Sequence, residues 1–188
     1  MSRAFLSLGS NIGDRRQFLT EAVDSLGTSV QAVSPVYETQ PVGGPNQGRF
    51  LNLVVELDTD LTPRELLAVC HRLESGAQRV RSERWGPRTL DVDIIWMDDV
   101  SLADADLQVP HPRWRERRFV LAPLRDLAPE LVDQATFDRS QGHVNVVEPL
   151  ARWARPASGP GSDRDLARTR AAQGDAHQQR PVEEGGDR

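Results

Sequence analysis

The amino-acid sequence predicts an α+β fold of the ferredoxin-like type, an antiparallel sheet with helices packed on it and long active-site loops. Some segments show the alternation or the short apolar runs of strands, and others show helical periodicity with start and stop signals. They follow one another in the order strand–helix–strand–strand–helix–strand. With 188 residues, of which 38 % are hydrophobic, the chain can build one modest core, and we expect the helices on one face of the sheet.

The first half of the chain supplies two strands, one helix and a loop. Residues 4–8 have the pattern of a short buried strand, and a helical pattern runs from Asp14 to a stop at Gly27. Residues 29–39 alternate in the manner of a second strand. Residues 40–48 are rich in glycine and proline and lack large apolar residues, which is typical of lids and binding loops.

The chain after residue 49 supplies two more strands and two helices. Residues 50–58 alternate as a strand, and residues 62–76 form a helix in which Thr62 is the expected N-cap. The remaining elements are a strand over residues 90–97 and a further helix, or a strand followed by a helix, over residues 118–127.

All 23 basic residues of the chain are arginine, and there is no lysine. This excludes Schiff-base chemistry and a P-loop, both of which need a lysine. The net charge of −5 argues against a general nucleic-acid binder, although arginines crowd residues 79–88 and 113–118. We therefore expect a small anionic ligand rather than a polymer.

Several negative signs indicate a cytoplasmic protein. No apolar run approaches the length of a membrane span, and the first residues show no signal-peptide pattern. The single cysteine, Cys70, excludes an internal disulfide and falls on the apolar stripe of its helix, so we assign it no chemistry.

Asp91 and Asp93 are the first residues that indicate a chemical site. In a strand they point to the same side, roughly 6–7 Å apart, while the apolar neighbours Val92 and Ile94 point to the other. Two like charges in register repel each other unless a cation lies between them. Oxygen ligands without nearby histidine or cysteine favour Mg²⁺, which usually arrives with substrate phosphates. The alternative for a lone Asp-x-Asp pattern is an exposed strand face.

Arginines and aromatic residues add two binding functions to this strand. Arg84 and Arg88, just upstream, can hold phosphate oxygens bidentately and keep their charge during phosphoryl transfer. Trp85 is either a cap on the core or a stacking surface for a flat ligand. Phe50 offers a second stacking surface, and Asn52 on the same strand face offers an amide. A planar heterocycle beside a metal-bound triphosphate fits this set.

These motifs resemble those of the 6-hydroxymethyl-7,8-dihydropterin pyrophosphokinase family from Leu6 to about Leu131. Four regions carry the resemblance, in the family's order: residues 6–14, residues 50–52, the arginine run 79–88 with Asp91-Val92-Asp93-Ile94-Ile95, and the closing segments 109–113 and 117–124. The pattern Arg-x-Gly-Pro-Arg-x-x-Asp-x-Asp is highly specific to that family.

The resemblance implies transfer of pyrophosphate from ATP to 6-hydroxymethyl-7,8-dihydropterin, with release of AMP, in folate biosynthesis. It implies two Mg²⁺ ions held by Asp91 and Asp93, which would act in catalysis with Arg79, Arg81 and Arg88. The pterin would be bound by Thr39, Val42, Phe50, Asn52, Trp85 and Phe119. The nucleotide would be bound by Glu74, Gln78, Arg79, Arg88, His111 and Arg117, of which His111 is indicated by the family pattern alone.

Three positions depart from the family pattern. Phe50 stands where tyrosine is common, Gln40 replaces a proline of some members, and Pro112 replaces an aromatic residue of some members.

Two rival functions stay open at this point. A nucleotidyltransferase would attack the α-phosphorus and release pyrophosphate, whereas a silent pterin- or nucleotide-binding module would turn nothing over. We expect a monomer without nucleic-acid or membrane partners, with a catalytic domain over residues 1–154 and a disordered tail over 155–188.

Overall fold

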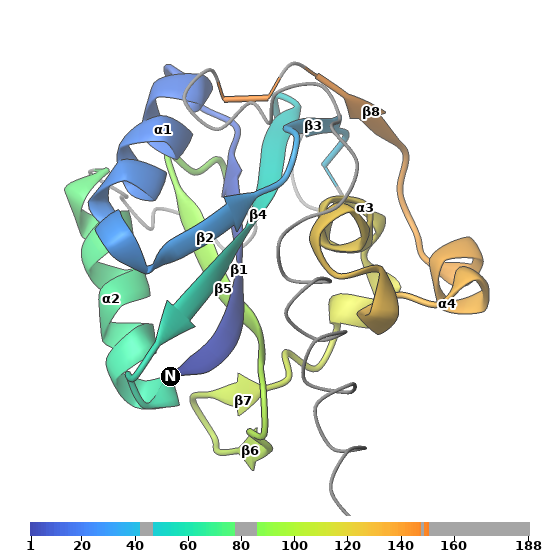
Figure 1. Ribbon diagram of the computed structural model, residues 1–188. Helices are drawn as coiled ribbons and strands as arrows, with labels where there is room; N and C mark the ends of the chain where they lie inside the picture. The colour runs from blue at the N-terminus through green and yellow to red at the C-terminus, as the bar shows by residue number, and fades with distance from the viewer. Residues whose placement is uncertain (42–46, 78–85, 148, 151–188) are drawn as a thin grey trace, which may run out of the picture. The chain divides into compact units, whose positions relative to one another are not determined.

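The computed structural model describes residues 1–41, 47–77, 86–147 and 149–150. Its centre is a six-stranded antiparallel sheet in the order β5-β1-β4-β3-β8, with β2 also paired to β4 (Figure 1). The strands are β1 (Ser2–Ser10), β2 (Val30–Val33), β3 (Tyr37–Thr39), β4 (Phe50–Thr59), β5 (Asp91–Met97) and β8 (Val144–Val146).

The strand predicted over residues 29–39 is divided into β2 and β3, which pair with different parts of β4. The break falls at Ser34 and Pro35, because proline has no backbone N–H to donate to a ladder. The Ser34 hydroxyl bridges the gap by accepting a hydrogen bond from the Val54 N–H at 3.0 Å. If β2 and β3 count as one strand, the order across the sheet is fourth–first–third–second, which is the ferredoxin-like order and confirms the predicted fold class.

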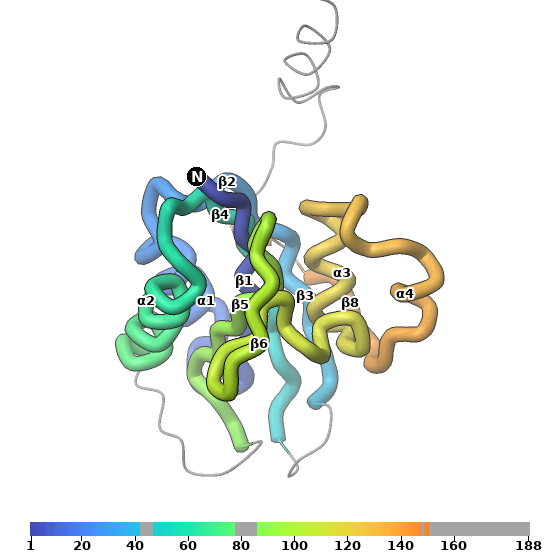
Figure 2. Tube along the Cα trace, turned by 90° about the horizontal axis from the view of Figure 1, so that it is seen from below, coloured from blue at the N-terminus to red at the C-terminus, as the bar shows by residue number. Residues whose placement is uncertain are grey.

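Helices α1 (Arg15–Ser25) and α2 (Pro63–Gly76) cover one face of the sheet, and α3 (Arg118–Leu127) covers the other (Figures 1 and 2). The cap predicted at Thr62 is in place, and Asp14, where the helical pattern begins, is also a cap. Asp14 caps α1 by accepting from the Gln17 N–H, and Thr62 and Glu65 form a reciprocal capping box at α2. The helix boundaries were thus encoded locally.

The placement of α3 differs from the expectation that the helices cover one face. Alternate residues of the strands enter two separate apolar clusters. Leu6, Leu8, Leu53 and Leu57 pack under α1 and α2 in the first. The second cluster packs against α3 and contains Phe5, Val54, Ile95, Trp114, Val120, Leu121 and Leu124. Large apolar residues on both faces of a central strand need cover on both faces, so the sheet is the middle layer of three.

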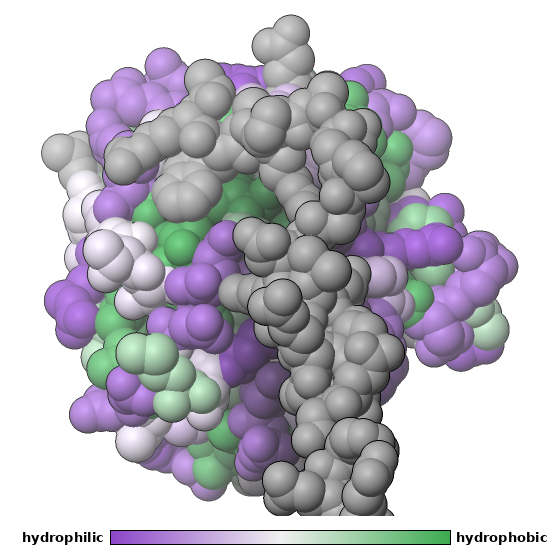
Figure 3. Space-filling model, in the orientation of Figure 1, coloured by the Kyte–Doolittle hydropathy of each residue, from purple (hydrophilic) through white to green (hydrophobic). Residues whose placement is uncertain are grey.

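Short elements complete the described fold. They are β6 (Leu102–Ala103), β7 (Gln108–Val109), α4 (Gln134–Arg139) and the 3-10 turns η1 (Gly27–Ser29), η2 (Trp114–Glu116) and η3 (Pro129–Leu131). None of these was predicted, since such short pieces span less than two periods of any pattern. In Figure 3 hydrophilic residues cover most of the visible described surface, and apolar residues show mainly in recesses between them.

The prediction for Cys70 is also settled. Cys70 is fully buried in the core, and burial raises the pKa of its thiol to about 12, so the assignment of a core role is confirmed. Within the part of the chain that the structure describes, no helix combines the length and apolarity that crossing a membrane requires. The predicted tail lies outside the described residues, and the division at residue 154 stays a prediction.

Replacing Thr62 by alanine removes one half of the capping box at α2. Loss of an N-cap hydroxyl costs about 1 kcal/mol, so we expect urea denaturation to show that loss in the free energy of unfolding. The exposed Thr28, replaced in the same way, serves as the control and should change stability by less than about 0.5 kcal/mol. Equal effects of the two substitutions would contradict the role of the cap.

Candidate active site

A cavity opens on the α3 side of the sheet, beside the ends of β1, β4 and β5. Antiparallel pairing places Asp91 opposite Gly9 and Gly9 opposite Asn52, so one row across three strands presents all three to the same face. The residues that line the cavity include eight of the sequence-predicted site residues: Thr39, Phe50, Asn52, Arg88, Asp91, Asp93, Arg117 and Phe119.

Asp91 and Asp93 both face the cavity, while Val92 and Ile94 between and beyond them are buried in the opposite core, as predicted. Each carboxylate has a cationic neighbour. Arg88 donates a hydrogen bond from Nη1 to Asp91 Oδ2, and Arg117 Nη1 lies 3.7 Å from Asp93 Oδ2. The cavity therefore presents two carboxylates on one strand face, each beside an arginine.

Among the described residues no cluster of three or more His, Cys, Asp or Glu side chains is placed to enclose a metal. The donor set still fits Mg²⁺, because this ion usually keeps several waters and takes one or two carboxylates together with substrate phosphate oxygens. The side chains of Asp91 and Asp93 are 24 % and 40 % exposed, so both can reach such an ion from the strand.

Arg117, which lines the cavity, and His111, which lies near it, both have lowered pKa values. Burial lowers the pKa of Arg117, and the carboxylate of Asp93 opposes that shift. Burial, followed by the positive charge of Arg117, lowers the pKa of His111 to about 4, so this imidazole is neutral at pH 7. His111 Nδ1 accepts a hydrogen bond from the Arg113 N–H at 3.1 Å, which places the ring proton on Nε2. His111 is not among the residues that line the cavity.

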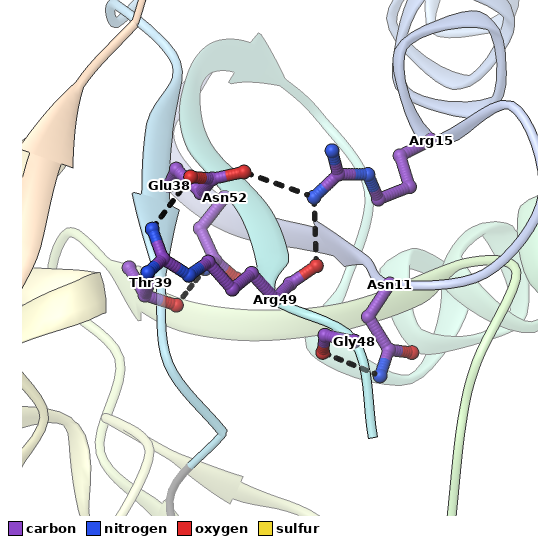
Figure 4. Close-up of polar contacts among 7 residues, drawn as sticks. All are labelled: Asn11, Arg15, Glu38, Thr39, Gly48, Arg49 and Asn52. Atoms are coloured by element: carbon purple, nitrogen blue, oxygen red, sulfur yellow. Dashed lines mark hydrogen bonds and ion pairs between the residues drawn. The ribbon is translucent and has the colours of Figure 1, made fainter.

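The apolar end is organised around Asn52, which is almost fully buried. Its Nδ2 donates a hydrogen bond to Thr39 Oγ1 at 2.8 Å, and this fixes the orientation of the amide (Figure 4). Asn52 Oδ1 then lies against the backbone of Gly9, where an added Cβ would come within 2.8 Å of it. The half-buried rings of Phe50 and Phe119 also line the cavity, and the Arg117 guanidinium lies 5.7 Å from the centre of the Phe119 ring.

Asn11 connects the segments on either side of the cavity. Its Oδ1 accepts from the Arg88 N–H at 2.7 Å, and its own N–H donates to the Arg88 carbonyl at 3.0 Å. Its Nδ2 donates to Gln47 Oε1 and to the Gly48 carbonyl at 3.0 and 3.3 Å (Figure 4). The sequence showed Asn11 only as part of the opening motif, because its partners lie 36 to 77 positions away.

Of the remaining predicted residues, one is described and does not line the cavity, and five lie outside the described part of the chain. Glu74 is buried on α2 and accepts a hydrogen bond from the Val92 N–H at 3.1 Å. It therefore supports the backbone between the two aspartates from the α2 side. Its predicted contact with the nucleotide stays a prediction. Val42, Gln78, Arg79, Arg81 and Trp85 lie outside the described residues.

Comparisons with known proteins identify the family. Residues 5–129 match the model of the 7,8-dihydro-6-hydroxymethylpterin-pyrophosphokinase family. The chain is 47 % identical over 136 residues to the 2-amino-4-hydroxy-6-hydroxymethyldihydropteridine pyrophosphokinase of Methylorubrum extorquens, over 70 % of this chain and 86 % of that protein. It is 45 % identical over 137 residues to the Bacillus subtilis protein of the same name, over 71 % of this chain and 82 % of that one. The chain belongs to this pyrophosphokinase family.

Solved structures give the same fold. Wild-type Plasmodium falciparum HPPK-DHPS matches with a TM-score of 0.54 at 15 % identity, over 73 % of this chain and 44 % of that one. This chain thus spans less than half of that protein. At this identity the match bears on the fold alone, and it agrees with the antiparallel sheet and packed helices described above.

Replacing Gly9 by alanine tests how closely the cavity floor is packed. The new Cβ would lie 2.8 Å from Asn52 Oδ1 and 3.7 Å from the Phe50 ring. We expect Asn52 to shift and the KM for the pterin to rise about tenfold or more, as about 1.4 kcal/mol of lost binding gives. Gly76→Ala is the control, since a Cβ there meets nothing within 4 Å. An unchanged pterin KM for Gly9→Ala would refute the expectation that the pterin contacts Asn52.

The lowered pKa of His111 predicts a pH dependence of stability. The unfolded chain takes up a proton at this residue near the ordinary pKa of about 6.5, whereas the folded chain does so only near 4. Stability should therefore fall as the pH drops from about 6.5 towards 4, and His111→Asn should reduce that fall. Thermal unfolding at several pH values measures it, with the exposed His143→Asn as control. Parallel curves for wild type and His111→Asn would contradict the assignment.

Proposed function

We propose that the cavity on the α3 side of the sheet is where this chain transfers pyrophosphate from ATP to 6-hydroxymethyl-7,8-dihydropterin. As a member of the family, the chain is an ATP-dependent pyrophosphokinase of folate biosynthesis. The observation that carries the assignment of the site is the row formed by Asp91, Gly9 and Asn52. It brings the carboxylate of Asp91 and the fixed, buried amide of Asn52 to one cavity, which supports the proposal.

Asp91 and Asp93 would hold two Mg²⁺ ions. When bound, these ions neutralise the phosphate charge of ATP and orient its oxygens. The aspartates suit this role because they sit on a strand that is buried behind them and hydrogen-bonded to Glu74, so their spacing is rigid. Arg88 and Arg117, now next to these carboxylates, can turn to the phosphates when the ions arrive.

Arginine guanidinium groups would bind the phosphates of ATP, with His111 beside them. Arg88, just before β5, and Arg117, just before α3, both line the cavity, and a guanidinium pairs with two phosphate oxygens at once. His111 can donate from Nε2 without adding charge. Glu74, Gln78, Arg79 and Arg81 complete the proposed nucleotide and catalytic set, by the family pattern.

The pterin would occupy the apolar end between Phe50 and Phe119. Stacking on aromatic rings suits a flat heterocycle. Asn52 is held by Thr39 so that its Oδ1 stays in a fixed position, and a fixed acceptor discriminates strongly between ring N–H groups and carbonyls. Val42 and Trp85 complete the proposed pocket, by the family pattern.

The reaction needs little from the protein beyond positioning and charge. The pterin hydroxyl oxygen forms a bond to the β-phosphorus of ATP, and the bond from that phosphorus to the oxygen shared with the α-phosphate breaks. AMP leaves with the shared oxygen, and the hydroxyl proton passes to solvent. Arg88 and Arg117 would stabilise the charge that moves onto the departing phosphate. We also propose that the loop over residues 43–48 and the arginine run 79–88 close over the bound substrates.

The finer features of the protein are proposals as well. We infer a cytoplasmic monomer that has no nucleic-acid partner, with residues 1–154 as the catalytic domain and 155–188 as a disordered tail. The net charge of −5 supports the lack of a nucleic-acid partner. The single, buried cysteine suits a reducing compartment.

The first test is incubation with ATP, Mg²⁺ and 6-hydroxymethyl-7,8-dihydropterin, with nucleotides separated by chromatography. AMP that appears only when pterin is present is the expected product. Pyrophosphate in place of AMP would indicate a nucleotidyltransferase, and binding without turnover would indicate a silent module. Either outcome would overturn the proposed reaction for this chain.

Asp93→Asn tests the proposed metal ligand. The amide keeps the size of the side chain but lacks the charge that holds Mg²⁺, so we expect turnover to fall by about a thousandfold or more. Circular dichroism should show an unchanged fold. Asp99→Asn is the matched control, because this exposed residue has a φ of 59°, which asparagine also tolerates. Near wild-type turnover in Asp93→Asn would refute the role.

A further inference from the structure

An ion-pair cluster outside the cavity joins α1 to both ends of the loop over residues 40–49. Glu38, on β3, accepts hydrogen bonds from Arg15 Nη1 at 3.3 Å and from Arg49 Nη1 at 3.1 Å (Figure 4). Arg15 Nη1 also donates to the backbone carbonyl of Arg49 at 2.8 Å. One guanidinium therefore contacts the strand that enters the loop and the residue that leaves it. We name Arg15, Glu38 and Arg49 the Arg15 clamp.

The Arg15 clamp lies on the sheet face away from the cavity. Glu38 pairs with Leu51, whose side chain belongs to the core under α1 and α2. The next pair of the same ladder is Thr39 with Phe50, and both of these line the cavity. This is the last pair of β3 and β4 before the loop. The clamp thus holds the loop ends from the opposite face of the sheet. It lies one residue away from Thr39 and Phe50, the two proposed pterin contacts.

Helix stability does not explain an arginine at this position. Arg15 is the first residue of α1, and the first turn of this helix contains no acidic residue. Because a helix N-terminus carries a partial positive charge, a cation there is unfavourable by about 0.3–1 kcal/mol. The side chain is 32 % exposed and that of Glu38 is 28 % exposed, so the apolar core does not require the pair either. The contact with the loop ends is what remains to account for Arg15.

We propose that Arg15 is a positioning residue for pterin binding: through the Arg15 clamp it fixes the ends of the 40–49 loop so that Thr39 and Phe50 stay at the spacing that the pterin ring requires. This inference rests on the proposed pterin pocket. Both hydrogen bonds are donated by the same Nη1, whose two hydrogens can point to a carboxylate and a carbonyl at once.

Arg15→Ala is the principal test, with steady-state kinetics at saturating ATP and Mg²⁺. We expect the pterin KM to rise about fivefold, the range for loss of a charge-assisted hydrogen bond in a partly exposed setting. The kcat and the ATP KM should stay within about twofold. The melting temperature should not fall, because the substitution also removes an unfavourable charge from the N-terminus of α1. Arg15→Lys should restore part of the pterin affinity.

Arg16→Ala is the matched control. It removes the same charge from the same helical turn, and its hydrogen bond within the described residues runs from Arg16 Nη1 to the Pro149 carbonyl. Its pterin KM should stay within about twofold of wild type. Equal pterin KM values for Arg15→Ala and Arg16→Ala would overturn the proposal. So would an Arg15→Ala enzyme in which kcat, both KM values and the melting temperature deteriorate together, since that pattern indicates a general structural role.

Asn52→Ala separates failure of this inference from failure of the proposed pocket. If Asn52→Ala raises the pterin KM and Arg15→Ala does not, the pocket stands and the Arg15 clamp does not position it. If neither substitution changes the pterin KM, the pterin binds elsewhere and both proposals fail. If both raise it while the ATP KM holds, the inference is supported.

Discussion

Strand β1 pairs with β4 on one side and β5 on the other, and the register of these two ladders is the constraint on which the site depends. Side chains alternate with a period of two, so pairing Gly9 with both Asp91 and Asn52 sends one row of residues to one face. A slip of one residue on either side would move a carboxylate or the amide into the core. Such a slip is prevented by the leucines and valines of the same strands, which would have to leave the core with it.

Two layers of packing keep that register rigid. The first core lies under α1 and α2, and the second, with Phe5, Val54 and Ile95, lies under α3. Because both faces are packed, the part of the sheet that presents Asp91 and Asp93 has little freedom to bend. Glu74 adds a hydrogen bond to the backbone between the aspartates.

The loop ends are held by polar contacts instead of apolar packing. On one side Asn11 joins the segment before β5 to the end of the 40–49 loop. On the other face of the sheet Arg15 joins both ends of the same loop through Glu38 and the Arg49 carbonyl. The described residues at the two ends of this segment are therefore held by contacts on both faces of the sheet.

The sequence alone determined the elements whose signals are local. The paired aspartates of β5, the cap at Thr62 and the alternation that separates Asn52 from its leucine neighbours could all be predicted, because periodicity and capping depend on residues a few positions apart. The family pattern added His111 and Arg117, whose roles no local rule indicates. The strand over residues 29–39 could be predicted, but not its division at Ser34.

Only the tertiary structure decided which of these elements meet. The sequence did not predict that α3 covers the second face of the sheet, since that depends on how much apolar surface all the strands present together. Nor did it indicate that Asn52 is fixed by Thr39, that Asn11 contacts Arg88, or that Arg15 reaches Glu38, because these partners are 13, 77 and 23 positions apart. Contacts at such separations follow from strand register and helix packing, and local sequence patterns carry no information about them.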